Sequence, residues 1–136
     1  MLAVTKEGLP WAVNIDGATR GEVLAIKPVI KALPAQVEVT ADKAYDVPWF
    51  RIWLMYLGHR PNIPYRACWY EHLKKREPAK PSENPMTYAG RWKVERALSW
   101  FGKFKRLNIR YEYLAPLYQA FWDLATALIL LPHILG

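Results

Sequence analysis

Residues 37–48 read VEVTADKAYDVP, a strand pattern that leads directly into the start of a helix. Apolar and polar residues alternate over residues 37–42, which is the period-two pattern of a short strand. Asp46 is placed to cap the helix that follows, Pro48 suits its first turn, and Gly58 ends it. This order of elements indicates an α/β fold.

The segments on either side add further elements. Residues 2–15 hold two apolar runs around a polar step that ends at Gly8, which predicts a β-hairpin. Residues 22–33 have helical spacing, although Pro28 must begin a new turn or kink the helix. Residues 60–66 contain two prolines, so a strand there is short or lies at a sheet edge. The polar, proline-rich residues 71–87 are typical of a loop or an insertion.

The last third of the chain predicts two helices. Over residues 91–109 apolar residues recur at spacings of three and four, which favours one amphipathic helix packed on the core. The apolar residues 114–131 predict a second helix, which we expect to be buried. Gln119 and Asp123 interrupt this stretch, and its unbroken apolar part is far shorter than the roughly 20 residues that cross a bilayer.

Composition narrows the class of protein. A chain of 136 residues, 52% of them hydrophobic, can bury one core, so we expect residues 1–136 to form a single domain. The net charge of +7 favours a polyanionic partner such as nucleic acid or an acidic membrane surface. Cys68 is the only cysteine, which excludes an intramolecular disulfide and fits a cytoplasmic protein. The first residues lack the basic segment of a secretory signal, so we expect no export.

Two acids stand out by their positions. Residues 91–110 contain seven cations and one acid, Glu95, and carry +6 of the chain's +7. An acid in so basic a segment either binds a metal ion or forms an ordinary ion pair with Arg91, one helical turn earlier. Asp42 ends a strand, where α/β folds present catalytic groups, but an aspartate there can also form a turn. Spacing alone favours the structural reading for both acids.

Several separated blocks resemble the C-terminal half of bacterial insertion-sequence transposases of the DDE superfamily. They occur in the family's order: ADKAYDVPWF (41–50), GHRPNIPYR (58–66) and residues 88–131, which begin YAGRWKVERALSW. The resemblance implies a ribonuclease-H-like fold, in which a mixed sheet flanked by helices holds two aspartates and a glutamate around Mg²⁺. It also implies cleavage and strand transfer of transposon-end DNA as the activity.

The same resemblance implies roles for individual residues. Asp42 corresponds to the second catalytic aspartate and Glu95 to the glutamate, so both are expected to bind metal. Tyr88 and Arg91 match the tyrosine and arginine that precede this glutamate in the family's signature. Six further cations are expected to contact the phosphates of DNA: Lys93, Arg96, Lys103, Lys105, Arg106 and Arg110.

The sequence departs from the family at three points, and one of them is Gly102, which stands where many relatives have a lysine seven residues after the glutamate. In the family the first catalytic aspartate lies on a strand before the hairpin, and this sequence begins inside the hairpin. The resemblance therefore predicts an incomplete sheet whose first strand is missing, with open strand edges and marginal stability. Ala44 replaces the usual glycine between Asp42 and Asp46, a small change if this residue has ordinary backbone angles.

Three functions are compatible with these residues. The preferred one is a DDE transposase fragment that acts when the upstream transposase product, or a second copy in a homodimer, completes it. The second is a catalytically inactive remnant that still binds DNA. A basic protein of the membrane surface comes third, and we expect no membrane partner.

Overall fold

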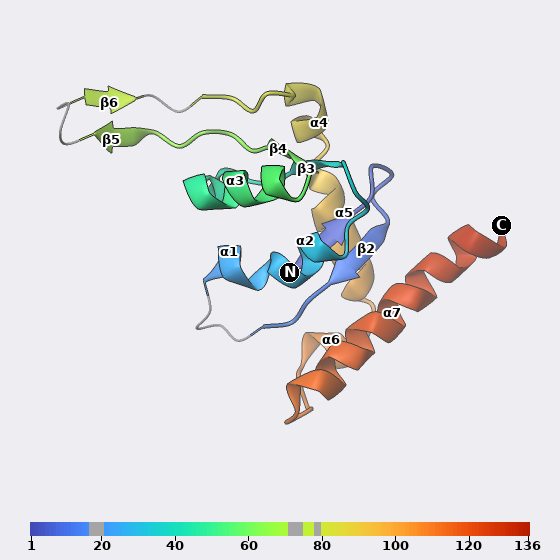
Figure 1. Cartoon of the computed structure of the whole chain (residues 1–136). Coiled ribbons are helices and arrows are strands. Elements are labelled where there is room, and N and C mark those ends of the chain that lie inside the picture. Colours follow the sequence, from blue (N-terminus) through green and yellow to red (C-terminus); the bar gives the residue numbers. More distant parts are fainter. Residues whose placement is uncertain (17–20, 71–74, 78–79) are drawn as a thin grey trace. The chain divides into compact units, whose positions relative to one another are not determined.

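The computed structural model contains the whole chain and describes residues 1–16, 21–70, 75–77 and 80–136. Helices and short strands are mixed along the chain, which confirms the predicted α/β class (Figure 1). The chain divides into two compact units. We call Met1–Leu33 together with Trp92–Gly136 the N/C unit, and Pro34–Arg91 the central unit.

The N/C unit begins with the predicted β-hairpin. Strand β1 (Leu2–Val4) pairs with β2 (Pro10–Val13) in antiparallel fashion, and the register shifts between Ala3 and Val4. The turn is closed by Thr5, whose carbonyl accepts from the Gly8 amide at 2.9 Å and whose amide donates to the Leu9 carbonyl at 2.8 Å. Gly8 has a φ of +89°, a conformation that favours glycine.

Two short helices follow, α1 (Glu22–Ala25) and α2 (Lys27–Lys31). Pro28 lies in the first turn of α2, where its missing N–H costs no hydrogen bond. Of the two outcomes expected at Pro28, a new turn or a kink, the structure has the new turn, and the single helix expected over residues 22–33 is therefore divided into two.

The predicted single helix over residues 91–109 is wrong, because the structure contains two. Helix α5 (Trp92–Phe101) ends before Gly102, and α6 (Lys105–Asn108) begins after an extended Phe104. Phe101 and Leu107 are buried in one cluster with Ala125. A continuous helix would point these two side chains about 120° apart. The break lets both face the same core, and the Asn108 side chain donates to the Gly102 carbonyl at 2.9 Å across it.

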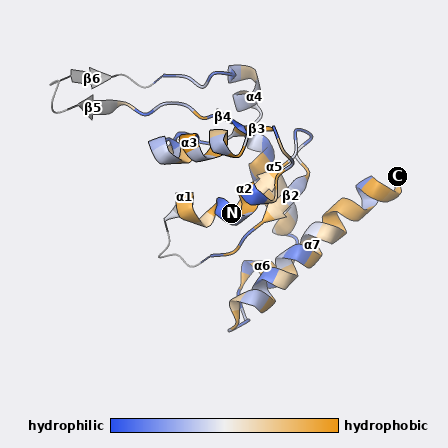
Figure 2. Ribbon diagram, in the orientation of Figure 1, coloured by the Kyte–Doolittle hydropathy of each residue, from blue (hydrophilic) through white to orange (hydrophobic). Residues whose placement is uncertain are grey.

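Helix α7 (Ala115–Leu135) extends the predicted last helix by four residues at its C-terminal end. One face packs on the cluster of Phe101, Leu107 and Ala125 through Tyr118, Phe121, Trp122 and Ile129. An adjoining face is exposed at Leu117, Leu124, Leu128 and Leu131, so the expectation of a buried helix is wrong. Figure 2 shows that the C-terminal part of α7 is mostly hydrophobic. In the described part of the chain, no helix combines the length and the apolar character needed to span a membrane.

The central unit is built on a strand-helix-strand segment. Strand β3 (Glu38–Thr40) pairs in parallel with β4 (Arg60–Asn62), and Val39 lies opposite Pro61. The 3-10 turn η1 (Lys43–Tyr45) and helix α3 (Pro48–Tyr56) connect them. The predicted strands are confirmed, and β4 is as short as its prolines indicated. Phe50, Leu54 and Ile63 are almost completely buried.

Gly58 ends helix α3, as predicted. Its φ is +81°, its amide donates to the Met55 carbonyl, and the His59 amide donates to the Leu54 carbonyl. This pair of bonds is the Schellman arrangement, which satisfies the last carbonyls of α3 and redirects the chain into β4.

Residues 71–87, expected to be a loop or insertion, contain regular structure. Strand β6 (Lys75–Glu77) pairs in antiparallel fashion with β5 (Cys68–Tyr70), and α4 (Pro85–Ala89) begins within the segment. Residues 71–74 and 78–79 lie outside the described residues. The strand did not stand out in the sequence because its pairing uses main-chain groups and needs no apolar pattern.

Candidate metal-binding and DNA-binding residues

Asp42 lies two residues after β3 and caps η1. Its Oδ1 accepts a hydrogen bond from the Ala44 amide at 2.5 Å. Among the described residues, no hydrogen-bond donor contacts its Oδ2. The turn-forming reading of Asp42 is thus confirmed for one carboxylate oxygen, and it leaves the other oxygen open to a ligand.

Ala44 stands where the resemblance leads us to expect a glycine, so its backbone angles decide whether this replacement causes strain. Among the described residues, Gln36 is the only non-glycine residue with a positive φ. Ala44 therefore has ordinary backbone angles, and its methyl group replaces the usual glycine without strain.

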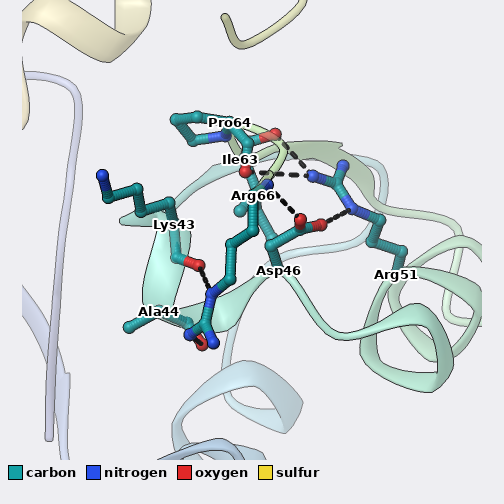
Figure 3. Close-up of polar contacts among 7 residues, drawn as sticks. All are labelled: Lys43, Ala44, Asp46, Arg51, Ile63, Pro64 and Arg66. Atoms are coloured by element: carbon teal, nitrogen blue, oxygen red, sulfur yellow. Dashed lines mark hydrogen bonds and ion pairs between the residues drawn. The ribbon is translucent and has the colours of Figure 1, made fainter. Parts of the chain in front are cut away.

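Asp46 does not cap α3, which corrects the prediction for this residue. Val47 holds the cap position, one residue nearer to the helix, and makes no side-chain cap bond. The Asp46 carboxylate instead accepts from Arg51 Nε at 2.8 Å and from the Arg66 amide at 2.6 Å (Figure 3). Only 11% of the Arg51 side chain and 13% of the Asp46 side chain are exposed. A hydrogen bond to a charged donor in such a place is stronger than the bond to a main-chain amide that a helix cap would provide.

The two arginines also bind main-chain carbonyls. Arg51 Nη2 donates to the Ile63 carbonyl at 2.6 Å, and its guanidinium lies 3.9 Å from the centre of the Tyr65 ring. Arg66 donates through Nε to the Lys43 carbonyl at 2.6 Å and through Nη2 to the Ala44 carbonyl at 2.5 Å. Figure 3 shows Asp46 between the two arginines. Residues 42–46, which we call the Asp42 turn, are therefore tied to residues 63–66.

Asn62, the last residue of β4, forms a further set of hydrogen bonds at the ends of β3 and β4. Its side chain is 2% exposed and donates to Thr40 Oγ1 at 3.2 Å and to the Asn84 carbonyl at 3.0 Å. The Asn84 amide donates back to Asn62 Oδ1 at 3.0 Å, and Asn84 caps α4 through a bond from the Thr87 amide. The pair therefore attaches α4 to the ends of β3 and β4.

Tyr88 and Arg91 lie at the end of the central unit. Tyr88 belongs to α4 and is half-buried, whereas Arg91 is exposed and follows the helix by two residues. The Arg91 amide donates to the Tyr88 carbonyl at 3.1 Å, which connects the two residues through the main chain.

Glu95 lies in the first turn of α5, exposed, and belongs to the N/C unit. A carboxylate there interacts favourably with the positive end of the helix dipole. Asp42 belongs to the central unit. In the described ranges no group of three or more His, Cys, Asp or Glu residues is placed to hold a metal ion.

Two of the expected DNA-binding cations contact the hairpin turn. Lys93 Nζ donates to the Lys6 carbonyl at 2.5 Å, and Arg96 Nη2 donates to the Glu7 carbonyl at 2.6 Å. A Cβ atom at Gly8 would lie 2.4 Å from Arg96 Nη2, so glycine makes this close approach possible. These contacts join residues about ninety positions apart in the chain, and no local pattern in the sequence indicates them.

The other four cations lie around α6. Arg106 pairs with Glu112 at 2.7 Å, and Arg110 donates to the carbonyls of Glu112 and Tyr113. Lys103 and Lys105 are exposed, and their ammonium groups have no hydrogen-bond partner among the described residues. Lys105 and Arg106 line an open cleft of about 360 Å³ together with Asn108, Ile109 and Tyr111.

Sequence reasoning missed Arg51, Arg66 and Asn62 as residues of the candidate site. Arg66 and Asn62 lie in the block GHRPNIPYR, so the resemblance already marked their segment. Their partners lie 20 to 24 residues away, and no helical or strand period connects such positions.

The chain is similar in sequence to known transposases. The family model described as "Transposase DDE domain" matches residues 1–130. A curated protein of Burkholderia cepacia, named "Putative transposase for insertion sequence element IS402", is 32% identical over 133 residues. The match covers 90% of this chain and 57% of that relative, so the chain spans little more than half of the relative's length. No solved structure matches the chain.

Proposed function

The chain belongs to the DDE transposase family, and on this premise we propose that it forms part of a catalytic domain in which Asp42 and Glu95 bind a divalent metal ion. The proposed fold of the whole domain is ribonuclease-H-like, and its proposed reaction is cleavage and strand transfer of transposon-end DNA. The chain spans 57% of the relative's length. We therefore propose, for the whole protein of which this chain forms a part, the activity of a transposase.

The position of Asp42 carries the proposal. It follows β3 at the carboxyl end of a parallel strand pair, the edge at which α/β folds bind ligands. One of its oxygens holds the turn, and the other has no donor in the described part of the chain. A carboxylate that is fixed in this way can bind a metal without first losing much rotational freedom.

The chemistry of the two acids suits Mg²⁺, which prefers hard carboxylate oxygens. A divalent metal bound there would activate the attacking oxygen and stabilise the leaving oxygen in phosphodiester cleavage. Asp42 and Glu95 provide two ligands, and we propose that the upstream transposase product or a second copy adds the third. Tyr88 and Arg91 are proposed to orient Glu95 or to contact the transferred strand.

The proposed DNA contacts come from the cations around α5 and α6. Lys103 and Lys105 support this part best, because their exposed ammonium groups are not used within the described protein. Arg106 lines the cleft next to Lys105 but is already paired with Glu112. Phosphate contacts of this kind make affinity fall steeply with salt. The proposed location is the cytoplasm, where the element's DNA lies.

Cleavage of DNA that carries the element's own ends tests this function. The chain is combined with the upstream product and Mg²⁺, and Asp42→Asn and Glu95→Gln are compared with the original sequence. We expect each variant to lose roughly a thousandfold in rate, because a lost ligand removes several kcal/mol of charge stabilisation. Glu83→Gln changes an exposed acid of the central unit and serves as the control, with an unchanged rate. Equal cleavage by all variants would contradict the proposal.

The alternative, an inactive DNA-binding remnant, makes a different prediction for the same experiment. Salt-dependent binding to DNA would persist, but no variant and no metal would give cleavage. Cleavage by the original sequence that requires Asp42 rules out this alternative.

A further inference from the structure

Arg66 contacts the peptide group that orients Asp42. Its Nε donates to the Lys43 carbonyl at 2.6 Å, and the amide of the same planar peptide, that of Ala44, donates to Asp42 Oδ1 at 2.5 Å. The two hydrogen bonds therefore form a chain that runs from the guanidinium through one peptide to the carboxylate. Bonds linked in this way polarise and strengthen one another.

A second contact joins the next carbonyl of the Asp42 turn to the same guanidinium. Arg66 Nη2 donates to the Ala44 carbonyl at 2.5 Å, so a single guanidinium binds two successive carbonyls. The guanidinium is a rigid fork, and a lysine in its place could bind only one of them well.

The main chain of Arg66 is itself fixed. Its amide donates to Asp46 Oδ2 at 2.6 Å, and Asp46 Oδ1 is bound by the largely buried Arg51. Arg51 in turn donates to the Ile63 carbonyl, three residues before Arg66. The position of the Arg66 side chain therefore follows from the end of β4, which pairs with the strand that leads to Asp42.

We propose that Arg66 is a positioning residue, which holds the Asp42 turn in the geometry in which Asp42 binds a divalent metal ion. The proposal rests on the proposed function for the role of Asp42. Arg66 itself is exposed, so the hydrogen bonds of its side chain contribute only modestly to global stability. Removing this side chain therefore affects the turn and its metal affinity more than the free energy of unfolding.

Amide hydrogen exchange in the metal-free full chain tests the structural half of the proposal. The variants are Arg66→Ala and Arg66→Lys, and Arg60→Ala is the matched control, an exposed arginine at the start of β4. We expect Arg66→Ala to speed exchange at the Ala44, Tyr45 and Asp46 amides by about tenfold, with amides of α3 unchanged. Arg66→Lys should lie between, and Arg60→Ala should match the original chain.

A titration of the full chain with Mn²⁺ alone tests the metal half. Bound Mn²⁺ broadens the NMR signals of nearby amides, and the Ala44 signal reports on Asp42. We expect Arg66→Ala to weaken this binding by about tenfold, the lower end of the effect of losing a contact that orients a metal ligand. Asp42→Asn should abolish the broadening, and Arg60→Ala should leave the affinity unchanged.

The outcomes separate this proposal from the proposed function. Unchanged exchange in Arg66→Ala, or an Mn²⁺ affinity that falls no more than in Arg60→Ala, would overturn the positioning role. If the original chain shows no Asp42-dependent broadening, the proposed function of Asp42 fails and the metal half of this inference fails with it. The exchange measurement then still decides whether Arg66 holds the turn.

Discussion

The central unit and the N/C unit each contain one of the two acids, and in both units cations bind main-chain carbonyls. In the central unit, Arg66 binds carbonyls 22 and 23 residues away and its amide binds the carboxylate of Asp46. In the N/C unit, Lys93 and Arg96 bind carbonyls 87 and 89 residues away, and these acceptors are uncharged. The first set lies within one strand-helix-strand segment, whereas the second joins distant parts of the chain.

This difference predicts unequal consequences when a contact is lost. In the central unit, removing Arg51 leaves the charge of Asp46 in a largely buried place, which is costly. In the N/C unit, removing one leaves a carbonyl at an exposed turn, which water can satisfy. The contacts of Lys93 and Arg96 show that a cation in the basic segment can bind the protein's own backbone. The number of cations in residues 91–110 is therefore larger than the number expected to contact phosphates.

The largest effect is expected for Arg51→Met. The substitution keeps most of the side-chain volume but removes the charged partner of Asp46, so the free energy of unfolding should fall by about 3 kcal/mol. Urea unfolding measures the change, with Arg60→Met as the exposed control. A loss no larger than in the control would show that the Asp46 pair does not stabilise the central unit.

A smaller loss is expected for Gly8→Ala in the N/C unit. Gly8 has a φ of +89°, and its Cβ would collide with the Arg96 guanidinium, so the unfolding free energy should fall by about 1 to 2 kcal/mol. Gly21→Ala is the control, because no atom lies within 4 Å of its added Cβ. Equal thermal unfolding of the two variants would mean that neither the positive φ nor the close approach of Arg96 requires glycine at position 8.

The salt dependence of DNA binding distinguishes the cations that bind the protein's own carbonyls from those that are exposed and have no hydrogen-bond partner in the described part of the chain. Lys103→Ala and Lys105→Ala should each lower the salt slope of binding by about one unit. Lys93→Ala should leave the slope close to that of the original chain, because its ammonium group binds the Lys6 carbonyl. Fluorescence anisotropy over a range of salt concentrations gives the slopes. An equal reduction by Lys93→Ala would show that this contact gives way to DNA.

The smallest effect concerns Glu112, the acid of the N/C unit that pairs with an arginine as Asp46 does. Burial raises the pKa of this carboxyl, but the Arg106 hydrogen bond and the neighbouring backbone amides outweigh it, and the pKa lies below its usual value. Because the folded pKa is lowered, the stabilisation is present above about pH 4.3 and is lost as the pH falls through the folded value. Glu112→Gln should therefore melt with a weaker dependence on pH below that point. Identical acid profiles would contradict this assignment.

Much of the fold was predictable because its signals are local. The hairpin around Gly8, the new turn at Pro28, the strand before Asp42 and the helix end at Gly58 all follow from backbone preferences of a few neighbouring residues. The break after α5 was not predictable in this way. It arises because Phe101 and Leu107 must share one core with α7, a condition that no helical period contains.

The candidate site was predictable only in part. The identity of Asp42, Glu95, Tyr88 and Arg91 as candidates came from the resemblance, while spacing alone favoured a structural reading for the two acids. Their roles remain predictions. The partner of Asp46 was missed, because a cap was the nearest local explanation and the actual partners include Arg66, 20 residues away.

The sequence by itself determined the order of the elements from the hairpin to β4, the family, and the place of Asp42 just after β3, since these depend on neighbouring residues and on blocks in a fixed order. Only the tertiary structure decided which cations are used internally, where the basic segment bends and what holds the Asp42 turn. Those outcomes depend on burial and on hydrogen bonds between residues 20 to 89 positions apart, and the geometry of such bonds exists only after the chain has folded.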